Sequence, residues 1–270
     1  LLFKRLEFKN MLGRFEVDAP KNQAEEHFKL VTEKKEAEKI FAKIKGIECA
    51  FQIIPMEDKK DANMDAGGQM NLFAAPQTKE FLGMAVCFGE EDTYFFRALT
   101  SGVLLDFLTH SAAAGYMTLD LKPQLGLLHM IEQRENGCLN QKNIFDNVIA
   151  AYLLNPLKNE YPYEDIAKDY SSLMIPSRVD LLGKLSYDLA MDEKPEEFLK
   201  TVCFMAYTAF ASKKAMMEDL KAAGMEHLYE TIEMPLVFTL ADMEHTGIAI
   251  DAANLKEYGE KLAVRIAELE

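Results

Sequence analysis

The chain has 270 residues, an apolar fraction of 49% and a formal net charge of −14 at pH 7. This length is enough for one large domain, or for a medium domain with appendages, and the apolar content is ordinary for a full core. Phosphate binding depends on clustered Lys and Arg, so the strong negative charge argues against tight binding of nucleic acid by this segment alone.

The features that bear on compartment favour the cytoplasm. No uncharged apolar run approaches the roughly 18 residues of a transmembrane helix, so we expect no membrane partner. The N-terminal stretch LLFKRLEF is too charged for a signal peptide and lacks an initiator Met, so we expect a piece of a longer, monomeric protein. Four well-separated cysteines with apolar neighbours and no CxxC pair favour reduced core thiols: Cys49, Cys87, Cys138 and Cys203.

The first half of the chain predicts a sheet. Residues 1–26 are mixed and highly charged, which predicts a helical tail plus linker. Thr32 can cap a helix whose apolar residues recur at helical spacing before Gly46. The runs that predict strands are 27–31, 47–54, 81–88, 93–98 and 116–120.

Helices dominate the second half. The predicted helices are 101–114, 123–135, 144–154, 163–171, 196–222, 226–245 and 252–270. Strands first, with helices covering the sheet and dominating later, indicate an α/β domain followed by a helical segment. Residues 56–79 lose all periodicity and predict a long, poorly ordered loop.

Common catalytic motifs are absent from the sequence. The five histidines are scattered, with no HExxH pair, which speaks against a zinc site. There is no GxSxG elbow, no P-loop and no GxGxxG fingerprint. Composition and spacing alone therefore predict an α/β domain and do not indicate which activity it has.

The C-terminal stretch IEMPLVFTLADMEHTGIAIDAANLKEYGEKLAVRIAELE (232–270) resembles the opening of the polymerase domain in family A DNA polymerases, the bacterial DNA polymerase I family. That pattern has an acidic-Met-Pro-Leu start, a helix ending in Glu-x-x-Gly, a hydrophobic-Asp pair and a long helix. The segments FDNVIAAYLLNP (145–156) and YEDIAKDY (163–170) also resemble family segments. The matching positions of the C-terminal stretch are Glu233, Pro235, Leu236, Glu244, Gly247 and Asp251.

The resemblance implies three parts. Residues 1–26 would be a linker from the end of the 5′-nuclease region, and residues 27–231 a 3′–5′ exonuclease-like domain. The implied fold of that domain is ribonuclease-H-like, with a mixed central sheet flanked by helices. Residues 232–270 would begin the polymerase domain. The parent enzyme would perform DNA-templated DNA synthesis in replication and repair, with Mg²⁺ as its cofactor, and would bind DNA.

Active exonuclease domains of this family hydrolyse DNA with two metal ions held by four carboxylates, because Mg²⁺ prefers charged oxygen ligands. This chain departs from the pattern at each position. Gln52 and Ile54 replace the Asp-x-Glu pair that follows an Ala-Phe strand, and Gln124 replaces the acid of Asn-Leu-Lys-x-Asp. Thr208 replaces the acid of Tyr-x-x-x-Asp, with Phe204 at the Tyr.

We therefore predict no catalytic residue, no metal site and no cofactor in this segment, which would act as a scaffold. Replacing buried carboxylates by Gln, Ile and Thr also removes like-charge repulsion and desolvation cost. Asp120 and Asp146 remain nearby, and we expect them to cap helices or face solvent. The alternative is an active metal-dependent 3′–5′ proofreading exonuclease whose ligands align in another register.

The loop also offers a candidate partner site. Residues 69–73, QMNLF, resemble the bacterial sliding-clamp binding pentapeptide Gln-Leu-Ser/Asp-Leu-Phe. Gln69 would form a hydrogen bond to the clamp, and Leu72 and Phe73 would fill an apolar pocket. In the alternative interpretation, Leu72 and Phe73 fold back over the sheet edge.

Overall fold

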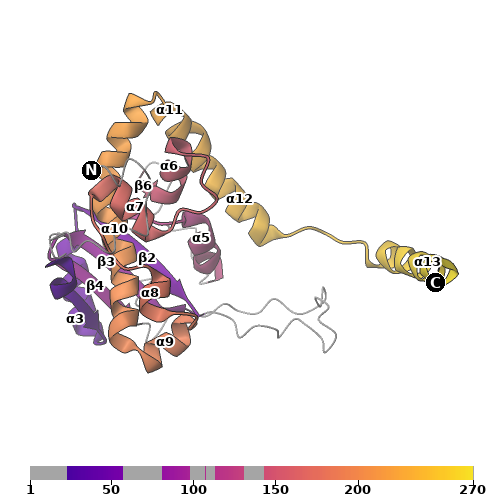
Figure 1. Ribbon diagram of the computed structural model, residues 1–270, viewed down its shortest axis with the longest axis horizontal. Coiled ribbons are helices and arrows are strands. Elements are labelled where there is room, and N and C mark those ends of the chain that lie inside the picture. Colours follow the sequence, from indigo (N-terminus) through magenta and orange to yellow (C-terminus); the bar gives the residue numbers. More distant parts are fainter. Residues whose placement is uncertain (1–22, 57–80, 98–106, 108–112, 131–142, 270) are drawn as a thin grey trace, which may run out of the picture.

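The computed structural model describes residues 23–56, 81–97, 107, 113–130 and 143–269. At its centre lies a six-stranded mixed sheet in the order β1-β4-β3-β2-β5-β6, flanked by helices (Figure 1). The predicted mixed sheet is therefore confirmed. The strands are β1 Phe28–Val31, β2 Glu48–Pro55, β3 Phe81–Gly89, β4 Asp92–Arg97, β5 Gly115–Thr118 and β6 Ile144–Asp146.

The strands β2, β3 and β4 form an antiparallel meander. On one side of it β1 pairs with β4 in parallel, and on the other side β5 and β6 extend the sheet in parallel with β2. The strand β5 pairs with β2 only along Glu48–Ala50, although β2 continues to Pro55. Within the described parts of the chain, the last residues of β2 therefore have no strand partner on the β5 side.

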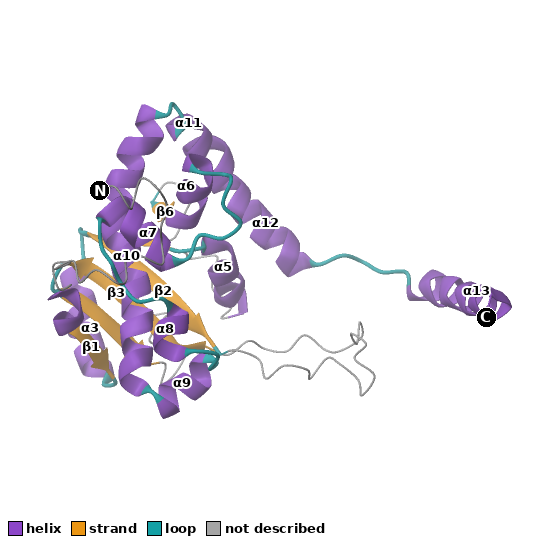
Figure 2. Cartoon of the chain, viewed as in Figure 1, coloured by secondary structure: helices purple, strands orange, loops and turns teal. Residues whose placement is uncertain are grey.

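Helices cover both faces of the sheet and also form the C-terminal part of the chain (Figure 2). Two of them are not regular α-helices: η1 is a 3-10 helix and η3 is a π-helix. The bounds are η1 Gln23–His27, α3 Lys34–Ile44, α5 Leu121–Met130, α6 Asn147–Leu154, α7 Tyr163–Ser171, α8 Arg178–Leu182, α9 Tyr187–Glu193, α10 Pro195–Ala222, α11 Glu226–Leu228, η3 Tyr229–Glu233, α12 Met234–Thr246 and α13 Ala252–Leu269.

Adjacent residues of β4 show the two faces of the sheet. Phe96 contacts Phe41 of α3, with ring centroids 4.8 Å apart. Phe95 points the other way and contacts Phe198 of α10, with centroids 5.3 Å apart. The 28-residue helix α10 therefore covers the face opposite α3, where it packs on β2, β3 and β4. It starts at Pro195, which fits the first turn of a helix because proline lacks an N–H.

The chain leaves the domain through α11, η3 and α12, which follow one another without a loop. The helix α12 packs along α5 and ends at Gly247, whose φ of 73° suits glycine. The helix α13 lies beyond it, with all its described residues exposed (Figure 1). No helix in the described part of the chain is long and apolar enough to cross a membrane.

Several predicted elements are corrected by the structure. The predicted helix 144–154 begins as the strand β6, because IFD is too short for its period to separate strand from helix. Thr32 does not cap α3, which begins after Glu33 without a side-chain cap. The helices α8 and α9 were not predicted. The tail 1–22, the loop with Gln69, Leu72 and Phe73, and nearly all of the predicted helix 101–114 lie outside the described residues.

Candidate functional site

Gln52 and Ile54, at the first predicted metal-ligand positions, lie on the sheet face that α10 covers. Gln52 pairs with Ala85, and Ala85 pairs with Phe95, so these side chains share one face. That face is the one covered by α10, since Phe95 contacts Phe198 there. Ile54 is two residues further on, shares the face and is 1% exposed.

Gln52, Thr118 and Gln124 form a buried hydrogen-bond chain, which we name the Gln–Thr–Gln network. Gln124 Nε2 donates to Thr118 Oγ1 at 2.6 Å, and Thr118 Oγ1 donates to Gln52 Oε1 at 3.3 Å. Gln52 Oε1 also accepts from the backbone N–H of Leu119 at 3.2 Å. The structure therefore brings two predicted site positions together through Thr118, a residue that sequence reasoning missed.

Gln124 also closes the gap that β5 leaves beside β2. Its Oε1 accepts from the backbone N–H of Ile53 at 2.9 Å, and its Nε2 donates to the carbonyl oxygens of Leu119 and Asp120 at 3.0 and 3.2 Å. The side chain is 2% exposed. An ionised carboxylate could accept from Ile53 but has no hydrogen to donate to the two carbonyls. Position 124 thus uses both ends of an amide.

Asp146, at the end of β6, is a buried carboxylate that accepts hydrogen bonds from four backbone N–H groups of the described residues. It caps α6 by accepting from the N–H groups of Val148 and Ile149 at 2.8 and 3.2 Å. It also accepts from the N–H groups of Leu121 and Asp120 at 2.7 and 3.3 Å, which fixes the turn between β5 and α5. The expected capping role of Asp146 is therefore confirmed.

Burial raises the pKa of Asp146 to about 6. The hydrogen bonds from Leu121, Ile149 and Val148 oppose this rise, whereas the negative charge of Asp120 adds to it. Asp120 itself is exposed in the turn, with a φ of 54° that Asp tolerates better than most residues. The Asp146 carboxylate thus serves both the turn before α5 and the cap of α6.

Tyr229 of η3 binds the backbone of Asp146 in both directions. Its hydroxyl accepts from the N–H of Asp146 at 2.7 Å and donates to the carbonyl of Asp146 at 3.2 Å. The ring packs on Phe145 with centroids 5.0 Å apart, and burial raises the pKa of the phenol well above its ordinary value. No sequence pattern predicted this contact, because it joins residues 83 positions apart.

Thr208 is fully buried on α10 but does not join the Gln–Thr–Gln network. Ser212, one turn later, donates to the carbonyl of Thr208 and accepts from Asn147 Nδ2 at 2.9 Å. This side of α10 thus faces the start of α6. Within the described chain, the Thr208 hydroxyl finds no hydrogen-bond partner. Among the described residues, no three His, Cys, Asp or Glu side chains form a group that could hold a metal ion.

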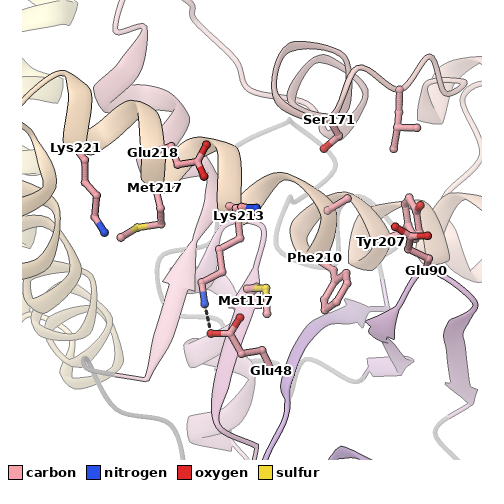
Figure 3. Close-up of a pocket in the computed structure, with 13 residues that line it drawn as sticks. Glu48, Glu90, Met117, Ser171, Tyr207, Phe210, Lys213, Met217, Glu218 and Lys221 are labelled. Atoms are coloured by element: carbon pink, nitrogen blue, oxygen red, sulfur yellow. Dashed lines mark hydrogen bonds and ion pairs between the residues drawn. The ribbon is translucent and has the colours of Figure 1, made fainter.

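A groove of about 800 Å³ lies at the opposite end of β2, beside α10 (Figure 3). Its apolar lining includes Met117, Phe210 and Met217. An ion pair between Lys213 of α10 and Glu48, the first residue of β2, lies in it. The groove was not predicted, and its mixture of charges favours no particular ligand.

The sheet and its covering helices form a ribonuclease-H-like fold, similar to that of solved 3′–5′ exonuclease structures. NrnC from Brucella melitensis, bound to pGG, superposes with a TM-score of 0.57 at 12% identity, over 83% of this chain and 97% of that one. RNase D from Escherichia coli, an exoribonuclease, superposes with a TM-score of 0.55 at 9% identity, over 82% and 51%. Another structure of NrnC contains bound Mg²⁺.

The relationship to bacterial DNA polymerase I is also confirmed. The Bacillus subtilis enzyme is 29% identical over 126 residues, and the Chloroflexus aurantiacus enzyme is 30% identical over 129. The alignment covers 47% of this chain and 14% of the Bacillus protein, so the chain spans a small part of that relative. The POL domain of Pol1 from M. smegmatis superposes with a TM-score of 0.62 at 16% identity, over 89% of this chain and 36% of that one. No family model matches the chain.

Gln124→Glu should lower the free energy of unfolding at pH 7 by about 2–3 kcal/mol relative to the wild type, because the carboxylate cannot donate to Leu119 and Asp120. The new carboxyl would be buried without a cation, so its pKa in the folded state exceeds its unfolded value. Stability should then be regained as pH falls from 7 to 5, when the proton restores a donor. Urea unfolding at both pH values measures this.

The matched control is Gln124→Met, which has a similar volume but cannot titrate. It should be destabilised relative to the wild type by the same amount at pH 7 and pH 5. If Gln124→Glu were as stable as the wild type at pH 7, position 124 would not need the donor, and the amide would have no structural role.

The pKa of Asp146 predicts a second pH effect. Because the folded-state value of about 6 lies above the unfolded value of 3.8, the folded state binds the proton more tightly, and stability should rise as pH falls from 7 to 4. The contribution is on the order of 3 kcal/mol. Asp146→Asn should remove this dependence of stability on pH. The control Asp192→Asn, at an exposed position, should leave the dependence unchanged. A slope that persists in Asp146→Asn would assign it to another group.

Proposed function

We propose that this segment is a non-catalytic, exonuclease-like scaffold domain of a DNA polymerase I. The observation that carries the proposal is the Gln–Thr–Gln network. It occupies two of the positions where the fold family needs carboxylates and uses both ends of Gln124 to bind backbone groups. The site is thereby filled with hydrogen bonds that support the fold.

The residues at this site do not fit the metal ions of the fold family. Gln52 and Gln124 offer neutral oxygens, which are already occupied by N–H and O–H donors. Ile54 offers no oxygen, and Thr208 lies on the side of α10 that faces α6. Mg²⁺ prefers carboxylate oxygens, and a two-metal site needs several of them to balance its charge. No hydrolytic step through a metal is therefore proposed here.

The scaffold role would be carried by the helices that follow the sheet. The proposal assigns residues 27–231 to the exonuclease-like domain, residues 232–270 to the start of the polymerase domain, and residues 1–26 to a preceding linker. The packing of α12 along α5 supports this assignment, because it joins the two parts through a helix pair.

The proposal extends to the parent protein. That protein would be a cytoplasmic, Mg²⁺-dependent DNA polymerase acting in replication and repair, and it would hold DNA mainly outside this segment. The relative from M. smegmatis was solved with a DNA primer-template and dNTP, which supports DNA as the ligand of the full-length enzyme. The net charge of −14 supports weak or no DNA binding by the segment itself.

The direct test is degradation of an end-labelled single-stranded oligonucleotide by the 270-residue chain with Mg²⁺ and then Mn²⁺. We expect no metal-dependent shortening, because the described residues provide no carboxylate set that could activate water. An active 3′–5′ exonuclease serves as the positive control.

EDTA-sensitive shortening that persists through purification to homogeneity would overturn the proposal. It would support the alternative of an active proofreading exonuclease with ligands in another register. Asp120→Asn and Asp146→Asn would then be the first variants to test for loss of that activity.

A second candidate function, sliding-clamp binding, has one favourable observation. The strands β2 and β3 form a hairpin in which Pro55 pairs with Phe81. The segment with the clamp-like motif therefore leaves and re-enters the sheet at one point. A motif presented there would not require any change in the sheet.

A labelled peptide of residues 66–77 should bind a bacterial sliding clamp saturably. Replacing Leu72 and Phe73 by Ala should weaken binding at least about tenfold, because these side chains would fill the apolar pocket. Asn71→Ala is the control, since the pattern tolerates small polar residues at that position. Fluorescence anisotropy measures the affinity, and equal affinity of all three peptides would reject the motif.

A further inference from the structure

We propose that the site at the end of β2 holds the helix α12 in place, so that Gln124 and Tyr229 are positioning residues for the polymerase-side helix. This inference rests on the proposed scaffold function and names the residues that would perform it. Two separate series of contacts connect α12 to the sheet, and both reach Asp146 at the end of β6.

The first route runs through η3. The π-helix ends at Glu233 and α12 begins at Met234, with no loop between them. Tyr229, the first residue of η3, is 2% exposed and is bound to both backbone groups of Asp146. The start of α12 is therefore tied to β6 within five residues. Because the helix is continuous from Tyr229, a shift of this side chain would shift α12.

The second route runs through α5. The helix α12 buries Met234, Val237, Phe238 and Ala241, and it packs along α5. In turn, α5 is fixed at its first turn by Gln124, which binds Ile53 of β2. The position of α12 thus depends on a helix that the Gln–Thr–Gln network fixes to the sheet.

The two routes meet at Asp146. Its carboxylate accepts from Leu121, the first residue of α5, at 2.7 Å, while its backbone binds Tyr229 at 2.7 Å. One buried residue therefore connects both supports of α12. The surface contact between the helices, Lys122 Nζ to Glu244 Oε1 at 2.6 Å, is between side chains that are 39% and 62% exposed. Exposed ion pairs contribute little, so the buried groups determine the position.

The experiment is native-state hydrogen exchange, read by mass spectrometry on peptides from α12, with urea unfolding run in parallel. Tyr229→Phe keeps the ring and removes only the hydroxyl. It should speed exchange in 234–246 about tenfold, since two buried backbone groups lose their partner. Exchange in α7 should change by less than twofold.

The matched control is Tyr163→Phe. The Tyr163 hydroxyl also bonds to a backbone carbonyl, that of Pro176 at 2.8 Å, but it lies in α7 away from α12. This variant should leave exchange in α12 unchanged. Gln124→Met provides a second variant that acts through α5, and it should speed exchange in α12 as well, by several-fold.

Equal acceleration of α12 by Tyr229→Phe and Tyr163→Phe, or acceleration of all helices together, would overturn the inference. In that case Tyr229 would contribute only to overall stability. This failure differs from failure of the proposed function: a nuclease-active chain could still show a local effect on α12, and an inactive chain could show none.

Discussion

The structure depends on one backbone N–H. The strand β2 continues to Pro55, but β5 pairs with it only as far as Ala50. The N–H of Ile53 therefore lies inside the core with no partner among the described strands, and a buried N–H without an acceptor costs free energy. Gln124 of α5 supplies the acceptor. The position of α5, and through α5 that of α12, follows from this requirement.

A second constraint, the cost of burying charge, accounts for the uncharged residues at the site. A set of buried carboxylates repel one another and lose their hydration, so they need metal ions to be stable together. The Gln–Thr–Gln network carries no charge and needs no ion, because each amide or hydroxyl finds a donor or acceptor within the protein. Asp146 shows the cost of keeping a charge there. Even with four backbone N–H groups directed at it, burial raises its pKa to about 6.

Local patterns predicted the elements that have a clear period or composition. The antiparallel strands β3 and β4, the helix α7 and the helix α10 follow the predicted ranges closely, because long apolar or periodic runs separate strand from helix. The three-residue strand β6 was missed, since its pairing with β5 comes from the sheet and not from its own sequence. The short helices α8 and α9 were also missed, although Ser177 and Asp180 form a capping box at the start of α8 that the sequence could have indicated.

The site was predicted in part. The family pattern identified Gln52 and Ile54 of β2 and Gln124 of α5 as site positions, but a pattern of missing acids does not show what replaces their interactions. Thr118 is a single polar residue in an apolar strand, and its role appears only when β5 lies beside β2. No sequence pattern indicated the role of Tyr229, because its hydrogen-bond partner is a backbone group 83 positions away in the sequence.

The contact between Tyr229 and Asp146 positions α12 without using any side chain of the catalytic positions. Tyr229 binds the N–H and the carbonyl of residue 146, which every residue except proline provides. The contact therefore does not depend on any carboxylate of the site. Gln124 similarly binds backbone groups of Ile53, Leu119 and Asp120. The Tyr229 contact can therefore persist when the side chains at positions 52, 54 and 208 are exchanged, whereas the support of α12 through α5 needs the side-chain amide of Gln124.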